Sequence, residues 1–243
     1  MTETPKAAML VIGDEILSGR TRDANMYHLA GQLTEHGLPL CEVRVVSDEM
    51  EAIIKAVQDL SASYTHVFTS GGIGPTHDDI TADAVAAAFG LPLDVRDDAR
   101  ALLAAHYEAS GKEFNAARQR MARIPEGAEL IANPVSVAPG FSLKNVHVMA
   151  GVPKVFNAML EDLLPRLSGG AKTLSITVAV ARPEGELAGP LGDIAQAFPD
   201  LSFGSYPFIR EGGIYGAELV VRGTDPARLA EAEAELQKLA PTP

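Results

Sequence analysis

A glycine-rich segment follows a short apolar, strand-like stretch near residue 68, and it reads Ser70-Gly71-Gly72-Ile73-Gly74-Pro75-Thr76-His77-Asp78-Asp79. Glycine has no Cβ, so backbone N–H groups in such a segment can approach an anion closely. A helix expected from about Ile80 would point the partial positive charge of its N-terminus at the same place. The pattern therefore predicts a phosphate-binding loop, although it lacks the lysine of a Walker A loop and does not spell G-x-G-x-x-G.

Carboxylates accompany this loop. Asp78 and Asp79 end it, and Asp14 follows the first predicted strand. Because a carboxylate repels phosphate unless a divalent cation lies between them, and because Mg²⁺ binds through one or two carboxylates plus phosphate oxygens, we expect a metal-bridged diphosphate site. Asp14 and Asp79 would hold a Mg, Co or Mn ion, with Asp78 beside them, and a monovalent cation is a further candidate. The alternative is that Asp78, Asp79 or Thr81 caps the helix.

Other side chains carry weaker signals. His77 could act as a general base, or it could simply face solvent. A group of arginines is explained by a helix surface, although one of them could reach a phosphate; the group is Arg118, Arg120 and Arg123. Cys41 is the one cysteine, so no internal disulfide can form, and its apolar surroundings predict a buried thiol. A reducing cytoplasm fits this cysteine content.

The elements that would position these loops alternate between strand and helix. Apolar runs at 7–12, 40–46 and 66–69 predict strands, and helical patterns follow each of them, the third running to Gly90. Helices interrupted near Gly111 are expected over 97–123, an irregular or hairpin segment over 125–140, a strand over 146–149 and a helix over 154–164. This order predicts a parallel-rich sheet covered by helices on both faces. Ligands bind beyond the carboxyl ends of such strands, where the loops after residues 12, 69 and 149 would meet.

The pattern changes after a linker at residues 168–170. Apolar and polar residues alternate strictly over 174–180, and a helix, two strands and a second helix follow. This βαββα order predicts a small α+β domain. We therefore expect two domains, 1–168 and 172–243.

Composition narrows the function. The chain has 243 residues, 47% of them apolar, and a net charge of −12, with both predicted domains acidic. An acidic surface argues against binding to a nucleic-acid backbone, which needs clusters of lysine and arginine. There is no apolar run near the ~20 residues that a membrane helix needs, and no signal peptide is visible. A cytoplasmic protein with neither a nucleic-acid nor a membrane partner is expected.

The motifs resemble a known family. Segment 13–19 with Asn25, and segment 69–81, resemble the molybdopterin-binding MoaB/Mog-like fold, above all the N-terminal branch of CinA, the competence/damage-inducible protein. Asn133, segment 138–141 and segment 151–153 extend the resemblance over about residues 6–167. The second part is similar to the small middle domain of CinA-like proteins and to a segment of eukaryotic FAD synthase. Because the chain ends at Pro243, the deamidase domain of full-length CinA is not expected.

The resemblance implies a three-layer MoaB/Mog-like α/β domain and two alternative activities. One branch binds molybdopterin, and some members adenylylate it; the other resembles a metal-dependent pyrophosphatase acting on ADP-ribose or FAD-like dinucleotides. Asp78 stands where the first branch usually has an arginine, which removes a phosphate-clamping cation and adds a potential metal ligand. The pyrophosphatase is therefore our leading expectation. A molybdopterin-binding or adenylyl-transfer protein and a non-catalytic nucleotide-binding module are the alternatives.

The ligand would be a nucleotide diphosphate or a pterin. Asp14, Asp78 and Asp79 are the expected catalytic residues. The expected ligand-binding residues are Gly13, Ser18, Gly19, Asn25, Ser70, Gly71, Gly72, Gly74, Pro75, Thr76, Gly151, Pro153 and Lys154. By resemblance, a homo-oligomer, either a dimer or a trimer, is expected.

Overall fold

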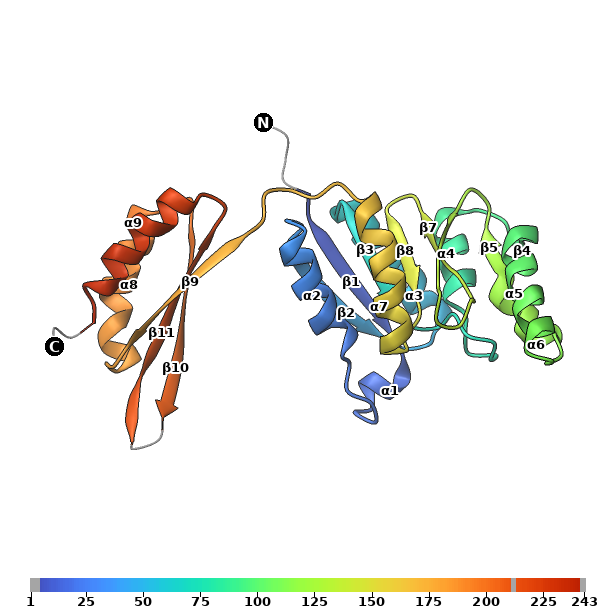
Figure 1. Ribbon diagram of the computed structural model, residues 1–243, viewed down its shortest axis with the longest axis horizontal. Helices are drawn as coiled ribbons and strands as arrows, with labels where there is room; N and C mark the ends of the chain where they lie inside the picture. The colour runs from blue at the N-terminus through green and yellow to red at the C-terminus, as the bar shows by residue number, and fades with distance from the viewer. Residues whose placement is uncertain (1–4, 211–212, 241–243) are drawn as a thin grey trace. The chain divides into compact units, whose positions relative to one another are not determined.

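A computed structural model describes residues 5–210 and 213–240 of the chain. The chain divides into two compact units, Met1–Gly170 and Ala171–Pro243, each with its own hydrophobic core (Figure 1). Within the described residues no helix is long and apolar enough to cross a bilayer.

The first unit is built on a six-stranded sheet. Its strand order is β2 (Leu40–Val46), β1 (Ala7–Ile12), β3 (His66–Ser70), β8 (Val146–Met149), β7 (Gly140–Leu143) and β6 (Glu129–Ile131). The first four strands are mutually parallel, and β7 and β6 run antiparallel to their neighbours. Every residue of β1 is buried, as its unbroken apolar sequence predicts for a strand covered on both faces.

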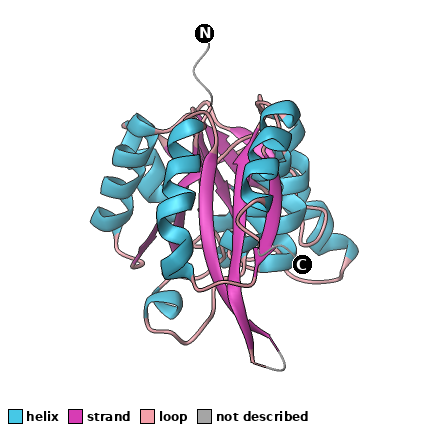
Figure 2. Cartoon of the chain, turned by 90° about the vertical axis from the view of Figure 1, so that its left-hand side faces the viewer, coloured by secondary structure: helices cyan, strands magenta, loops and turns pink. Residues whose placement is uncertain are grey.

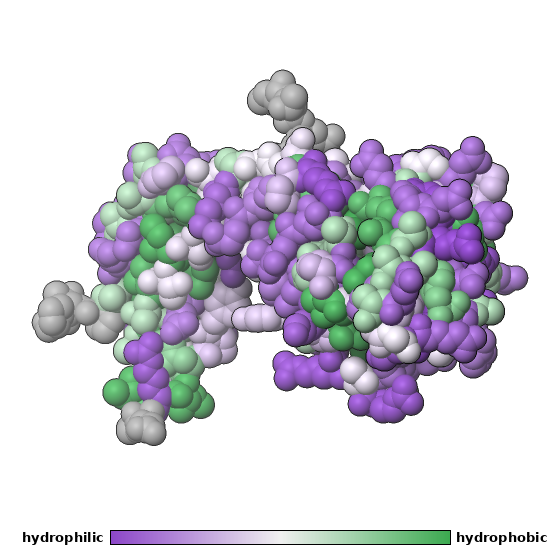
Figure 3. Space-filling model, turned by 45° about the vertical axis from the view of Figure 1, so that its right-hand side comes forward, coloured by the Kyte–Doolittle hydropathy of each residue, from purple (hydrophilic) through white to green (hydrophobic). Residues whose placement is uncertain are grey.

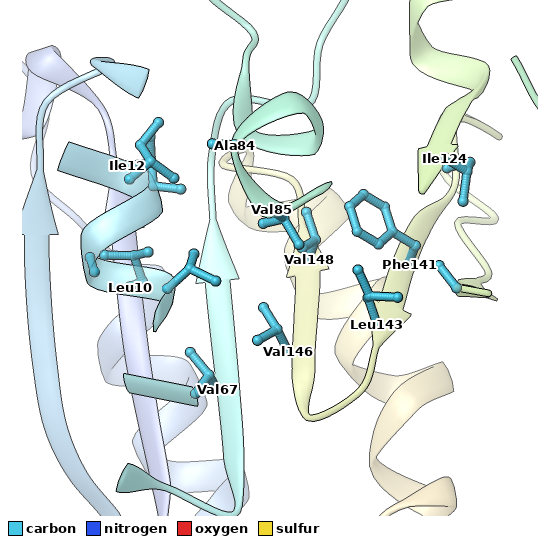
Figure 4. Packing of buried hydrophobic residues seen from close by; sticks show 14 of the residues in the cluster. Leu10, Ile12, Val67, Ala84, Val85, Ile124, Phe141, Leu143, Val146 and Val148 are labelled. Atoms are coloured by element: carbon cyan, nitrogen blue, oxygen red, sulfur yellow. The ribbon is translucent and has the colours of Figure 1, made fainter. Parts of the chain in front are cut away.

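Helices cover both faces of this sheet. The helices α2 (Asn25–Glu35) and α7 (Pro153–Leu163) pack on one face, against side chains such as Met9. The helices α3 (Met50–Ser63), α4 (Thr81–Phe89) and α5 (Asp97–Ala109) contribute to the core on the other face, where Leu10 and Ile12 meet Val85 and Val148 (Figure 4). This is the three-layer α/β fold that the sequence predicts, and that prediction is confirmed.

The expected interruption near Gly111 is confirmed, because α5 ends at Ala109 and α6 (Ala116–Gln119) follows after a loop. The strands β4 (Leu93–Val95) and β5 (Arg123–Pro125), which pair with each other, were not expected, because strands of three residues have no periodicity to detect. One expectation for this unit is wrong. Cys41 is exposed rather than buried, since β2 is an edge strand whose alternate residues, Cys41, Val43 and Val45, are exposed.

The second unit has the predicted βαββα order. Its antiparallel sheet has the order β10 (Ser202–Arg210), β11 (Ile214–Gly223) and β9 (Leu174–Val180). The helices α8 (Glu184–Ala197) and α9 (Pro226–Gln237) pack on one face of this sheet, and the β10–β11 hairpin reaches beyond them (Figure 2). Ile209 and Tyr215, paired across that hairpin, are 86% and 60% exposed, and the space-filling view shows hydrophobic side chains at its tip (Figure 3).

Candidate functional site at the carboxyl ends of the strands

A cavity of about 580 Å³ lies beyond the carboxyl ends of the parallel strands. Residues from six separate segments line it: Ile12, Glu15 and Thr21; Asp48; Gly71 to Pro75 with Asp78 and Asp79; Met121; Asn133, Ser136 and Ala138; and Ala150 to Pro153 with Val155 and Met159. Cavities of this size accept a mononucleotide or another drug-sized ligand.

The glycine loop after β3 is shaped by close backbone contacts. Gly71 has φ 112°, and a Cβ there would overlap the carbonyl oxygen of Ile12 at the end of β1. Gly72 has φ 66°, and a Cβ there would overlap the Thr81 hydroxyl. That hydroxyl donates to the Gly71 carbonyl over 3.0 Å, and the Thr81 N–H donates to the Gly72 carbonyl over 3.0 Å. The loop is thereby fixed to the first residue of α4.

Asp79 forms hydrogen bonds inside the same loop. Its Oδ2 accepts hydrogen bonds from the Thr76 N–H at 2.7 Å and from the Thr76 hydroxyl at 2.5 Å. The expected alternative, a side chain that caps α4, is wrong, since the N-cap is Ile80 and no side chain caps this helix. Asp79 thus orders the loop with one carboxylate oxygen, as a turn-forming aspartate does.

An acidic group lies on one wall of the cavity. Asp48, which follows β2, accepts a hydrogen bond from the Asp14 N–H at 2.9 Å. Burial raises the pKa of Asp48, and the negative charges of Asp14, Glu15 and Asp78 raise it further, against the opposing effect of that hydrogen bond. The structure therefore brings Asp14 and Asp78 together around a carboxylate that we did not predict. The signal was available, because Asp48 follows a parallel strand at the same sheet edge.

These carboxylates do not form a complete metal site by themselves. Among the described residues, no three histidine, cysteine or acidic side chains converge closely enough to hold an ion. Asp14 is exposed and is not one of the described residues that line the cavity, and Asp79 uses one oxygen on Thr76. A divalent cation here would need ligand phosphate oxygens or water for much of its coordination, which is how Mg²⁺ is usually held. The Asp14–Asp79 metal site stays a prediction.

Asn25 ties together three of the predicted segments. From the first turn of α2, its Nδ2 donates to Ser70 Oγ and to the Gly151 carbonyl, both over 2.8 Å. Its side chain is 2% exposed, and no hydrogen-bond donor reaches its Oδ1 from the described residues. Asn25, Ser70 and Gly151 also line a small side cavity of about 60 Å³. Asn25 is thus a bridge between the loops that follow β3 and β8.

The remaining predicted binding residues fall into two groups. Pro75, Gly151 and Pro153 line the main cavity, as do the three loop glycines. The other predicted residues lie beside the cavity: Gly13 is buried, and Ser18, Gly19, Thr76 and Lys154 are exposed without lining it.

The weaker candidates, three arginines and His77, are not among the described residues that line the main cavity. Arg120 lies behind the glycine loop, where its Nη2 donates to the Asp79 carbonyl at 3.3 Å. Arg123 is bound to the Asp83 carboxylate, and Arg118 donates to the Glu113 carbonyl. None of the three guanidinium groups lines the main cavity of the described structure. His77 is exposed, with its ring 3.9 Å from Asp78.

A three-layer, parallel-rich sheet with a glycine loop at the carboxyl ends of its strands defines an α/β domain of the MoaB/Mog-like type. The family model described as a probable molybdopterin binding domain matches residues 8–169, and the model for the middle domain of FAD synthase matches residues 172–242. The chain belongs to this molybdopterin-binding, MoaB/Mog- and CinA-like family.

Individual relatives support this family assignment. A protein from Caldivirga maquilingensis is 36% identical over 166 residues, 67% of this chain and 65% of that protein. A CinA-like protein from Citrifermentans bemidjiense is 38% identical over 169 residues, 68% of this chain and 41% of the relative. The chain thus spans less than two thirds of the length of both. The crystal structure of the protein CinA with unknown function from Thermoplasma acidophilum matches with a TM-score of 0.62 and 33% identity, covering 67% of this chain and 98% of that one.

Proposed function

We propose that the main cavity binds a phosphorylated heterocycle, and that a molybdopterin-type pterin is its ligand. The observation that carries this proposal is the glycine loop, fixed to the start of α4 at the mouth of a 580 Å³ cavity. The family's description as a molybdopterin-binding domain supports the pterin as the ring system.

The loop offers the phosphate two attractive features. Gly72 and Gly74 carry no Cβ, so an anion can approach the loop backbone there, whereas the Gly71 N–H already donates to the Met149 carbonyl at 3.2 Å. The N-terminus of α4, which has no capping side chain, adds its partial positive charge. Because Glu15, Asp48 and Asp78 lie nearby, the ligand's phosphate would need a divalent cation such as Mg²⁺, Co²⁺ or Mn²⁺ beside it.

A second proposal is metal-dependent hydrolysis of the pyrophosphate bond in ADP-ribose or FAD-like dinucleotides. The observation that favours it is the four carboxylates on the cavity wall, Glu15, Asp48, Asp78 and Asp79, which suit a divalent cation better than a bare phosphate. If the pocket binds such a dinucleotide without cleaving it, the domain is a nucleotide-binding module.

Calorimetric titration tests the first proposal. The purified chain is titrated with molybdopterin, AMP, ADP-ribose and FAD, each with and without Mg²⁺, and we expect the pterin to bind most tightly. Gly74→Ala would place a Cβ 2.6 Å from Asp79 Oδ2, so this variant should lose about tenfold or more in affinity. Gly189→Ala, in α8 with open space around it, is the matched control. The absence of binding by all four compounds would exclude the proposal.

A turnover assay tests the second proposal. The chain is incubated with ADP-ribose or FAD and Mg²⁺, Co²⁺ or Mn²⁺, and released AMP is measured. If the pyrophosphatase exists, Asp79→Asn should lower turnover by about 10²-fold, because it weakens both the loop and the charge that would hold the cation. Binding without AMP release under all three metals would leave the binding function and eliminate the hydrolase.

A further inference from the structure

The main cavity is chemically polarised along the order of the strands. Glu15 and Asp48 follow β1 and β2 at one end of the sheet, and the glycine loop follows β3 in the middle. At the other end, the connection from β6 to β7 contributes Asn133, Ser136 and Ala138. Met121, Val155 and Met159 line that end, where Asp79, which shares a smaller cavity with Met121 and Pro139, is the acidic residue.

The connection from β6 to β7 is ordered by one side chain. Asn133 is 6% exposed, and its Oδ1 accepts hydrogen bonds from the N–H groups of Val135 at 3.0 Å and Ser136 at 3.1 Å. Its Nδ2 donates to Ser136 Oγ at 2.7 Å and to the Ala138 carbonyl at 2.8 Å. Both donors and both acceptor sites of this amide are therefore used within the loop.

The same loop holds a strained residue. Val137 has φ 68°, a conformation that a β-branched residue rarely adopts and that costs on the order of 1 kcal/mol or more. Its N–H donates to the Asn133 carbonyl at 2.9 Å, which helps to maintain this conformation. Such strain persists only where the surroundings determine the backbone, and it concentrates at sites where the geometry is used.

The result is a hydroxyl group that is only partly used within the loop. Ser136 Oγ accepts the Asn133 Nδ2 hydrogen, and its own O–H has no acceptor among the described residues. The residue is exposed and lines the cavity at its apolar end. Because a serine hydroxyl has one donor and two lone pairs, Ser136 can still donate one hydrogen bond and accept another.

We infer that Ser136 is a specificity-determining residue whose hydroxyl hydrogen-bonds to a polar atom on the edge of the ligand's heterocycle. The ring lies at the apolar end, beside Met121 and Met159, and the phosphate points toward the glycine loop and the carboxylates. This inference rests on the proposed function, and it adds the direction in which the ligand lies and the chemical group that is recognised.

The test compares ligands with and without a ring. Binding of GDP, ADP and inorganic pyrophosphate, each with Mg²⁺, is measured by calorimetry for the wild type, Ser136→Ala, Ser136→Thr and the control Ser110→Ala, which lies at the exposed end of α5. Ser136→Ala should weaken binding of at least one nucleotide by about 3- to 10-fold, the worth of one hydrogen bond, and leave pyrophosphate binding unchanged. Ser136→Thr, which keeps the hydroxyl, should restore the nucleotide affinity. A stronger effect on GDP than on ADP would place the contact at a group that only guanine carries, such as its 6-carbonyl, and the reverse at the 6-amino group or N1 of adenine.

A second variant tests the loop itself. Val137→Gly removes the strain and frees the backbone, so it should weaken nucleotide binding about 2- to 5-fold without lowering the melting temperature. If nucleotides bind the wild type and Ser136→Ala binds them equally well, the inference is wrong and the proposed function stands. If the wild type binds neither nucleotide nor pyrophosphate, the inference is wrong, and the titration with molybdopterin decides the proposed function.

Discussion

The amino ends of β3 and β8 carry histidines, whereas a glycine loop and carboxylates lie at the carboxyl ends. At the amino ends, His147 Nε2 and His66 Nδ1 share a hydrogen bond of 3.0 Å, and Ser142 Oγ lies 2.8 Å from His147 Nδ1. Burial, reinforced by the nearby His66, lowers the pKa of His147 from 6.5 to about 3. At the carboxyl ends lie the glycine loop and an acidic wall whose Asp48 has a raised pKa. The first end satisfies its polar groups internally, whereas the second leaves groups available for a ligand.

The difference also predicts how each end responds to pH. A neutral buried histidine opposes protonation of the native state, so its effect is to make stability fall as the pH falls. Asp48, partly buried and close to other carboxylates, has the reverse effect, because the folded protein holds its proton more tightly than the unfolded chain does. The two ends of the strands therefore change the stability of the fold in opposite directions as the pH falls.

The largest expected effect concerns His147. Between pH 6.5 and about pH 3 the unfolded chain binds a proton at this residue that the native state does not, so the free energy of unfolding should fall by about 5 kcal/mol across that window. Above pH 6.5 both states are neutral and this contribution is constant. Chemical denaturation measured at pH steps of about 0.5 gives the curve. His147→Gln should flatten it, although the variant is less stable at pH 7, while His106→Gln, on an exposed turn of α5, should leave it steep.

Gly71→Ala comes next. A Cβ at φ 112° would overlap the Ile12 carbonyl, so either the loop or the end of β1 must move, and we expect the free energy of unfolding to fall by about 3 kcal/mol. Urea denaturation measures it. The matched control is Gly31→Ala in α2, which has open space around it and should be neutral or slightly stabilising. Equal stability of the two variants would mean that the loop does not depend on this close approach.

Asn25→Ala should have a smaller effect on stability. It removes the donor to Ser70 Oγ and to the Gly151 carbonyl, leaving buried acceptors unpaired, at a cost of about 2 kcal/mol. Because the loops after β3 and β8 lose their bridge, ligand affinity should fall as well. Asn157→Ala in α7 provides a comparison at a partly buried asparagine away from these loops. Unchanged stability and affinity in Asn25→Ala would mean that the Asn25 hydrogen bonds do not hold the pocket together.

The smallest expected effect has the opposite sign. Asp48→Asn keeps an oxygen to accept the Asp14 N–H and removes one charge from the acidic wall, so the free energy of unfolding should rise, by about 0.5 kcal/mol at pH 7. This gain should disappear as the pH falls toward the ordinary aspartate pKa of 3.8, where the wild-type carboxyl is protonated too. Ligand binding that depends on Mg²⁺ should weaken in the same variant. A loss of stability at pH 7 would contradict the idea that this wall destabilises the fold.

Periodicity and turn residues were sufficient to predict most of the first unit. The unbroken apolar run of β1 predicts a strand buried on both faces, and the glycines after β3 mark the loop. The arm formed by β4 and β5 was missed, because three-residue strands pair through contacts distant in the sequence. Cys41 was misplaced because its apolar neighbours Val43 and Val45 predict an inward face, whereas in the edge strand β2 these alternate residues are the exposed ones.

The site was predicted less completely than the fold. Asp78 and Asp79 stood out beside the glycines, but the engagement of Asp79 by Thr76 depends on the local turn geometry. Asp48 could have been found by applying the rule for strand ends to β2 as well. Ser136 had no signal of its own, since its role depends on Asn133 and on the backbone of Val137.

The exposed thiol on β2 has a practical consequence. With one cysteine per chain, at Cys41, oxidation can join two copies through a disulfide but cannot add a third copy. A cross-linked pair on a non-reducing gel would therefore report that two β2 edges approach each other, and a single maleimide dye would mark that edge while leaving the ligand pocket untouched.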